Sequence, residues 1–246
     1  MDRTAPTAMI ARRFDGCDVA GFIASEKLDG VFARWDGARL VSRDGVVLAA
    51  PSWFTAGLPA GVLLDGELWT RRGDFDRASG IARSQNGDWS ALRFMLFDAP
   101  SALPFSERLR VIDAIATPYC CAVPTVALVD VRDLAERMTE IVNGGGEGMV
   151  VRAADSAYVT DGHATSYKVK FCDDAEAIVV AHYAGGIVLS RDGVTFRVGS
   201  GLTTAQRRNP PVLGSVVTYR YDGLTGKGLP RFPRLVGVRH DVRVVA

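Results

Sequence analysis

The chain has 246 residues, of which 48% are hydrophobic, and a formal net charge of +1 at pH 7. This length suits one large domain or two modest ones, and the apolar content is sufficient for a folded core. No run of about 18 apolar residues occurs, which argues against a membrane-spanning helix. We therefore expect a globular protein without a membrane partner.

The N-terminus and the cysteines bear on localisation. The opening residues, MDRTAPTAMIARRF, contain no apolar h-region, so no secretory signal is visible; export of a longer precursor to the periplasm stays open as an alternative. Cys17, Cys120, Cys121 and Cys172 lack the paired spacing of a zinc site and suit no common disulfide framework. We expect buried, reduced thiols in a cytoplasmic protein.

Positive charge is concentrated in the last part of the chain. Residues 173–246 carry ten Lys or Arg against six Asp or Glu, a net charge of +4, whereas residues 1–172 carry nineteen against twenty-two, a net charge of −3. A basic C-terminal module fits a polyanionic partner, and an ordinary solvated surface explains the charge equally well.

The first 172 residues alternate strand and helix patterns without a regular βαβ period. Alternating apolar residues bounded by turn dipeptides predict strands at Phe22–Lys27, Val31–Trp35, Ala38–Ser42, Gly61–Thr70, Leu92–Asp98, Gly148–Ala153 and Ser166–Phe171. Helices are predicted at Pro51–Gly57, Asp74–Arg83, Ser106–Ala116 and Val131–Val142. Ser106 is expected to be an N-cap, and the run Gly144–Gly146 to end the last helix.

The remaining residues, 173–246, are almost entirely strand. Five strands are predicted, with one short helix, Thr203–Arg208, among them: Ala177–Tyr183, Gly186–Ser190, Val194–Gly199, Ser215–Tyr221 and Leu235–Val244. Five short strands with one small helix are typical of an OB-fold barrel. The sequence thus predicts an α+β protein with two domains, a mostly antiparallel-sheet domain at 1–172 and an OB-fold domain at 173–246.

Six short motifs that carry chemically useful side chains follow one another in the first domain. They are Lys27-x-Asp29-Gly30, Ser42-Arg43-Asp44-Gly45, Leu64-Asp65-Gly66-Glu67, Phe94-Met95-Leu96-Phe97-Asp98, Glu147-Gly148-Met149-Val150-Val151-Arg152 and Lys168-Val169-Lys170. Each alone has an ordinary reading, as a surface charge or a core aromatic residue. Their joint occurrence in this order favours a functional site.

This ordered set resembles the covalent nucleotidyltransferases, the superfamily of ATP-dependent DNA ligases, RNA ligases and mRNA capping enzymes. The C-terminal stretch YRYDGLTGKGLPRFPRLVGVRHD narrows the resemblance to small bacterial ATP-dependent DNA ligases with a nucleotidyltransferase domain and an OB domain. The resemblance covers nearly the whole chain. It implies a monomer that seals 5′-phosphate/3′-OH nicks in duplex DNA with ATP as AMP donor and Mg²⁺, or Mn²⁺, as metal ion.

The resemblance also implies a role for each motif residue. Lys27 matches the nucleophile that forms a lysyl–AMP phosphoramidate, a reaction that requires a neutral amine. Asp29, Gly30 and Arg43 match nucleotide-ordering positions, and Phe97 matches the aromatic residue on which adenine stacks. Glu67 and Glu147 match carboxylates near the ribose and the metal. Lys168 and Lys170 match the pair that holds the α-phosphate, and their spacing puts both side chains on one face of a strand.

One position departs from the DNA ligase pattern. The first motif usually reads K-x-D-G-x-R, and the arginine contacts the nick phosphate; Phe32 stands there in this chain. Phenylalanine has no donors for a phosphate, which puts nick sensing or turnover in doubt. Arg34 is expected on the same strand face and is a candidate replacement.

Further DNA contacts are predicted in the OB domain, whose basic face would follow a nucleic-acid backbone. The candidates are Arg220, Lys227, Arg231 and Arg234. Arg231 and Arg234 also fall in the segment that resembles the family's last motif, which engages the pyrophosphate during adenylylation. We expect DNA binding to be weak and strongly salt-dependent.

Two alternatives stay open at this point. Phe32 is compatible with an RNA ligase or a GTP-using capping enzyme, and labelling by GTP but not ATP would favour the latter. A non-catalytic nucleic-acid-binding relative is also compatible with Phe32, although the retained lysines and carboxylates argue against loss of catalysis.

Overall fold

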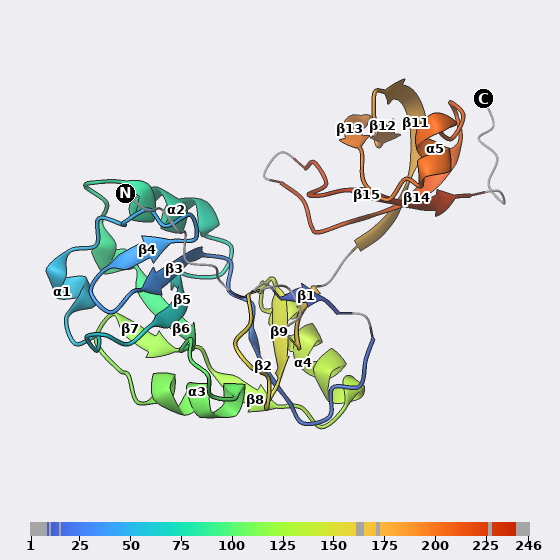
Figure 1. Ribbon diagram of the computed structural model, residues 1–246. Helices are drawn as coiled ribbons and strands as arrows, with labels where there is room; N and C mark the ends of the chain where they lie inside the picture. Colours follow the sequence, from blue (N-terminus) through green and yellow to red (C-terminus); the bar gives the residue numbers. More distant parts are fainter. Residues whose placement is uncertain are drawn as a thin grey trace. The chain divides into compact units, whose positions relative to one another are not determined.

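The computed structural model describes residues 9, 11–14, 16–160, 165–170, 173–225 and 228–239. The chain divides into two compact units, Met1–Lys170 and Phe171–Ala246; Figure 1 draws the first in blue to yellow and the second in brown to red. Within the described residues, no helix is both long and apolar enough to cross a membrane.

The first sheet of the first unit has the order β4-β3-β5-β6-β7. Its strands are β3 (Val31–Trp35), β4 (Leu40–Ser42), β5 (Leu64–Trp69), β6 (Arg93–Asp98) and β7 (Cys120–Ala122). The pairs are antiparallel except β6 with β7. Alternation in β6 buries Phe94 and Leu96 in the core and leaves Met95 and Phe97 half-buried on the other face. One face of the sheet is thereby available for a site.

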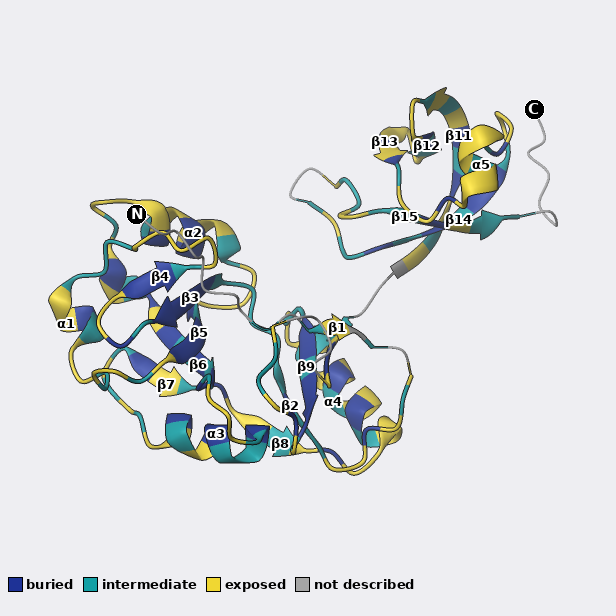
Figure 2. Ribbon diagram, viewed as in Figure 1, coloured by how far each residue is buried: buried dark blue, intermediate teal, exposed yellow. Residues whose placement is uncertain are grey.

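Short helices complete the core beneath this sheet. They are α1 (Ser52–Thr55), α2 (Phe75–Arg83), the 3₁₀ turn η1 (Trp89–Ala91) and α3 (Phe105–Asp113). Phe54, Trp89 and Ile112 pack with the buried side chains of β5 and β6. Figure 2 shows buried positions along β3, β5 and β6 and exposed positions on the outer surfaces of the helices.

The second sheet of this unit has the order β1-β10-β9-β2-β8. Its strands are β1 (Arg12–Arg13), β2 (Phe22–Glu26), β8 (Thr125–Ala127), β9 (Gly148–Ala153) and β10 (Ser166–Lys170). Helix α4 (Val131–Asn143) packs Leu134 and Met138 against Met149 and Val151 of β9. The carboxylate of Asp130 caps this helix by accepting a hydrogen bond from the Asp133 amide.

The second unit is an antiparallel sheet of order β13-β12-β11-β14-β15. Its elements are β11 (Asp173–Tyr183), β12 (Gly186–Arg191), β13 (Val194–Val198), α5 (Thr204–Arg208), β14 (Val216–Tyr221) and β15 (Arg234–Val238). A bridge between Ser200 and Arg234 joins the segment after β13 to β15. The two ends of the sheet are thus connected, as in a barrel. The capping box of Thr203 and Gln206 starts α5.

The predicted fold class, a mixed and mostly antiparallel α+β protein with a C-terminal part built mainly of strands, is confirmed. Some predicted details were wrong. Helix α3 begins at Phe105 with Pro104 at the N-cap, and the amide of Ser106 donates to the carbonyl of Ala154. Strands β1, β7 and β8 were not predicted, because two or three residues show no alternation. The strand expected to reach Val244 is described as Arg234–Val238, and residues 240–246 lie outside the described part.

Candidate active site

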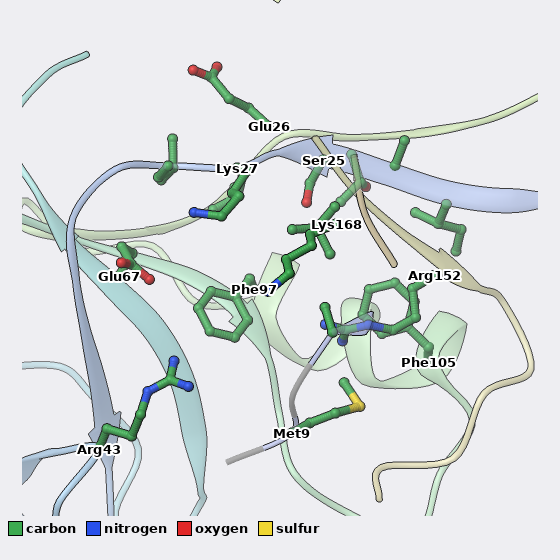
Figure 3. Close-up of a pocket in the computed structure, with 17 residues that line it drawn as sticks. Met9, Ser25, Glu26, Lys27, Arg43, Glu67, Phe97, Phe105, Arg152 and Lys168 are labelled. Atoms are coloured by element: carbon green, nitrogen blue, oxygen red, sulfur yellow. The ribbon is translucent and has the colours of Figure 1, made fainter. Parts of the chain in front are cut away.

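A cavity of about 240 Å³ in the first unit is lined by side chains from both sheets. Lys27 follows β2, Glu67 and Phe97 lie on β5 and β6, and Arg152 and Lys168 lie on β9 and β10. Figure 3 shows Lys27, Glu67 and Arg43 on one side of the Phe97 ring, and Arg152, Phe105 and Met9 on the other. The cavity thus brings together Lys27, Arg43, Glu67, Phe97 and Lys168, which lie far apart in the sequence.

Lys27 is fixed through both its backbone and its amine. Its amide donates to the carbonyl of Gly148 at 2.8 Å, and Nζ donates to Oε2 of Glu147 at 2.5 Å. The other carboxylate oxygen of Glu147 pairs with Nζ of Lys170. One carboxylate therefore holds two lysines at the end of β9.

Gly148 explains how Glu147 comes so close to β10. A Cβ at Gly148 would lie 2.3 Å from the carbonyl oxygen of Val169, so only glycine fits this approach of β9 to β10. Lys170 is the register partner of Gly148, and Lys168 is that of Val150. Gly148, directly after Glu147, is thus required for steric reasons.

Glu67 lies on β5 opposite Phe32 of β3. The amide of Gly30 donates to its carboxylate, and a Cβ at Gly30 would lie 2.5 Å from the Leu68 carbonyl oxygen and 2.8 Å from Cγ of Glu67. Burial of the carboxyl group raises the pKa of Glu67 to about 7, with Lys27 and Arg43 opposing the rise and Glu147 adding to it. Gly30 therefore admits the carboxylate that the site requires.

A β-bulge in β6, where it pairs with β5, determines the position of Phe97. The register of β5 with β6 pairs Gly66 with Leu96 and Asp65 with Asp98, so Phe97 is the extra residue. The Phe97 ring lies 6.2 Å from that of Phe32, centroid to centroid. The bulge thus places an aromatic ring in the cavity wall.

Asp29 is half-buried, and it is not among the residues that line either described cavity. Gly30 lines a second cavity, which also includes Arg43 and Glu67 in its wall. Five of the predicted site residues thus line the first cavity: Lys27, Arg43, Glu67, Phe97 and Lys168.

The structure does not support Arg34 as a DNA contact. Its guanidinium binds both oxygens of the Asp65 carboxylate, at 2.6 and 2.9 Å, and Nη2 also donates to the Tyr158 hydroxyl. The side chain is 8% exposed. A buried guanidinium held by a carboxylate cannot grip a phosphate at the surface, so Phe32 has no replacement in Arg34.

The DNA-contact candidates of the second unit differ in their surroundings. Arg220 forms a two-pronged pair with Asp174, and Arg234 pairs with Asp222 at 2.9 Å. Arg231 is exposed, and Lys227 lies outside the described residues. Arg231 thus remains the accessible candidate among those described.

Sequence reasoning assigned no role to Arg152, which lines the cavity. Arg152 donates to Asp98 at 2.5 Å, and Arg108 of α3 donates to the same carboxylate at 2.6 Å. The sequence feature that could have indicated Arg152 is its position: it ends the motif that begins at Glu147, and its partner Asp98 directly follows Phe97. The cysteine expectation also fails in part, because Cys121 is exposed.

The donor set around Glu67 and Glu147 fits a divalent ion. Within the described residues no group of three or more His, Cys, Asp or Glu side chains gathers. Glu67 and Glu147 are near enough for their charges to interact. Mg²⁺ commonly takes one or two carboxylates together with substrate phosphate oxygens and water. Two carboxylates whose charges interact match that pattern.

Comparisons with known proteins agree with this geometry. A family model described as a DNA ligase OB-like domain matches residues 179–239. The DNA ligase of Haemophilus influenzae is 33% identical over 239 residues, which are 91% of this chain and 89% of that protein. A solved Lig E DNA ligase is 35% identical, with a TM-score of 0.84 over 95% of this chain and 99% of that chain. The adenylated ligase of Chlorella virus, at 19% identity and a TM-score of 0.57 over 95% and 99% of the two chains, shares the fold.

Proposed function

Because the chain belongs to the DNA ligase family, we propose that it seals 5′-phosphate/3′-OH nicks in duplex DNA with ATP as the AMP donor. The first unit would be the nucleotidyltransferase domain, and the second is its OB-like partner. The family membership favours a DNA ligase over an RNA ligase, a capping enzyme or a non-catalytic relative. One observation carries the proposal: the Lys27 amine lies in a cavity with Arg43, Glu67, Phe97 and Lys168.

The proposed reaction has three displacements at phosphorus. Lys27 Nζ attacks the α-phosphorus of ATP, a nitrogen–phosphorus bond forms, the amine loses its proton, and pyrophosphate leaves. An oxygen of the DNA 5′-phosphate then attacks the same phosphorus, the nitrogen–phosphorus bond breaks, and Nζ of Lys27 takes up a proton as it leaves. The 3′-hydroxyl finally loses its proton as it attacks the 5′-phosphorus, and AMP leaves.

The surrounding side chains position and neutralise, as phosphoryl transfer requires. Lys168 and Lys170 emerge on one face of β10 and would hold the α-phosphate oxygens. Phe97 offers a stacking face for adenine, worth roughly 1–3 kcal/mol by analogy with base–aromatic stacking. Glu147 aligns the Lys27 amine, because its carboxylate already accepts from Nζ.

Mg²⁺ is the proposed metal ion, with Glu67 and Glu147 as its protein ligands. When bound, it would neutralise phosphate charge. We also propose that the protein is a monomer. Its cytoplasmic location remains a prediction from the sequence.

The decisive experiment is incubation of the whole chain with α-³²P-labelled ATP and Mg²⁺, followed by a denaturing gel. A label that survives denaturation and is absent from Lys27→Ala is expected. Lys168→Ala should weaken labelling without removing the nucleophile, and Arg132→Ala, a change on the exposed face of α4, should leave it unchanged.

A chase with nicked DNA would then test the later displacements. The label should leave the protein and the nick should be sealed. Labelling by GTP alone, or no labelling by either nucleotide, would overturn the proposal.

A further inference from the structure

Phe32 lies next to the proposed nucleotide site, in the wall of the second cavity, although it cannot do what the family's usual arginine does. It lies on β3 as the register partner of Glu67, and 8% of its surface is exposed. Its ring contacts two residues of the proposed nucleotide site. This arrangement is informative because Arg34 is fully engaged elsewhere.

The first contact is with Arg43. The guanidinium carbon of Arg43 lies 4.8 Å from the centroid of the Phe32 ring. A guanidinium within about 6 Å of an aromatic centroid is attracted to the negative face of the ring. Arg43 lines both the first cavity and a second cavity of about 550 Å³, whose wall includes Phe32. The ring therefore holds a cation at the boundary between the two cavities.

The second contact is with Phe97. Their ring centroids are 6.2 Å apart, with planes inclined at 46°, which is within the range in which aromatic pairs attract. Phe97 is the bulge residue of β6, so it has no register partner in β5 to fix its place. Phe32 thus supports the residue on which adenine is proposed to stack.

We propose that Phe32 is a positioning residue for adenylylation, which holds the Arg43 guanidinium and the Phe97 ring in place for ATP. This inference rests on the proposed function and deepens it. It gives position 32 a role in the first displacement, whereas the usual arginine acts on the nick.

The chemistry of position 32 makes the inference testable by substitution. Leucine would fill apolar space there but has no aromatic face for the guanidinium. Tyrosine would keep that face. Arginine would remove the ring and add a second positive charge beside Arg43, while restoring the donors that a nick phosphate needs.

The test measures the rate of Lys27 labelling against ATP concentration in Phe32→Leu, Phe32→Tyr and Phe32→Arg; for this single turnover, KM denotes the half-saturating ATP concentration and kcat the limiting rate constant. Loss of the cation–π contact should raise KM roughly three- to tenfold in Phe32→Leu, with a smaller change in kcat. Phe32→Tyr should keep KM close to that of the unmodified chain. In an Arg43→Ala background, Phe32→Leu should have a smaller effect on KM, because the cation–π partner is already absent and only the contact with Phe97 remains to be lost.

Phe94→Leu is the matched control. Phe94 is buried in the same sheet on the core side, so it should lower the melting temperature and leave KM for ATP unchanged. Sealing of a pre-adenylylated nick, which bypasses the first displacement, should be little affected by Phe32→Leu.

Two results would overturn the inference. One is a Phe32→Leu variant whose KM is unchanged, or is raised equally with and without Arg43. The other is a Phe32→Arg variant that seals nicks faster at an unchanged KM for ATP. Failure of the unmodified chain to label at all would instead overturn the ligase mechanism itself.

Discussion

Glu147 and Glu67 are two carboxylates of one site in different surroundings. Glu147 contacts two ammonium groups, those of Lys27 and Lys170. Glu67 accepts from the Gly30 amide, but burial dominates and raises its pKa from an ordinary value of 4.5 to about 7. The site therefore holds one compensated carboxylate and one whose charge costs folding free energy.

Glu67→Gln should reveal that cost as a pH-dependent stability. Because the folded-state pKa is raised, the protonated carboxyl contributes stability below about pH 4.5, and that contribution is lost as the pH rises through about 7. The glutamine variant should therefore be more stable than the unmodified chain at pH 8, and the difference should shrink toward pH 5.

Thermal unfolding of Glu67→Gln and of the unmodified chain, with a chelator and without nucleotide, measures their stability difference at each pH. Glu107→Gln, a change of an exposed carboxylate on α3, should show no such pH-dependent difference. A stability difference between Glu67→Gln and the unmodified chain that stays constant from pH 5 to pH 8 would contradict the raised pKa of Glu67. Glu67→Gln should also reduce Lys27 labelling.

The adjacent thiols Cys120 and Cys121 should differ sharply in reactivity. Cys120 is buried, which raises its pKa to about 12, whereas Cys121 is exposed. Thiolate is the reactive species, so iodoacetamide at pH 8 should modify Cys121 in the native protein and Cys120 only after denaturation. Fragment-ion mass spectrometry distinguishes the two. Native modification of Cys120 at a comparable rate would show that β7 opens readily.

At the scale of elements, Asp98 joins three of them around the cavity. It ends β6 and accepts from Arg108 of α3 and from Arg152 of β9. The Asp98 and Arg108 side chains are 0% exposed, and that of Arg152 is 7% exposed. The carboxylate thus links the first sheet to the second sheet next to Phe97.

Asp98→Asn should destabilise the first unit by about 3–5 kcal/mol, because it leaves two buried guanidinium groups without their counter-charge. Calorimetry of the whole chain is the measurement. Glu136→Gln is the control; its partner Arg132 is on the surface of α4, with the two side chains 63% and 86% exposed. Such a pair contributes about 0–1 kcal/mol. Equal shifts for both variants would contradict a structural role for Asp98.

At the scale of the whole molecule, the two units differ in net charge, −3 for Met1–Lys170 and +4 for Phe171–Ala246. Binding of a polyanion should therefore depend on the second unit. The resulting counterion release makes affinity fall with salt, with a log–log slope of about −0.9 for each phosphate contact on duplex DNA.

Arg231→Ala should reduce the magnitude of that slope by about one, because Arg231 is an exposed cation of the basic unit. Fluorescence anisotropy with nicked duplex DNA at several salt concentrations measures the slope. Arg110→Ala, a change of an exposed arginine on α3 of the first unit, is the control. An unchanged slope in Arg231→Ala would remove this residue from the DNA contact surface.

The α+β class, most helices and strands, and the motifs that supply Lys27, Glu67 and Phe97 to one cavity could be predicted from the sequence. This was possible because alternation, turn residues and ordered motifs are local in the chain. The short strands β7 and β8 and the start of α3 at Phe105 were not accessible in this way.

The contacts of the charged and aromatic side chains depend on the three-dimensional fold and could not be predicted from the sequence. Arg34 and Phe32 lie on the same strand, yet Arg34 is buried against Asp65, whereas Phe32 lies under Arg43. Arg152 and Asp98 meet across two sheets although 54 positions separate them in the chain. Burial and pairing depend on such long-range approaches, and the spacing of residues along one strand does not contain them.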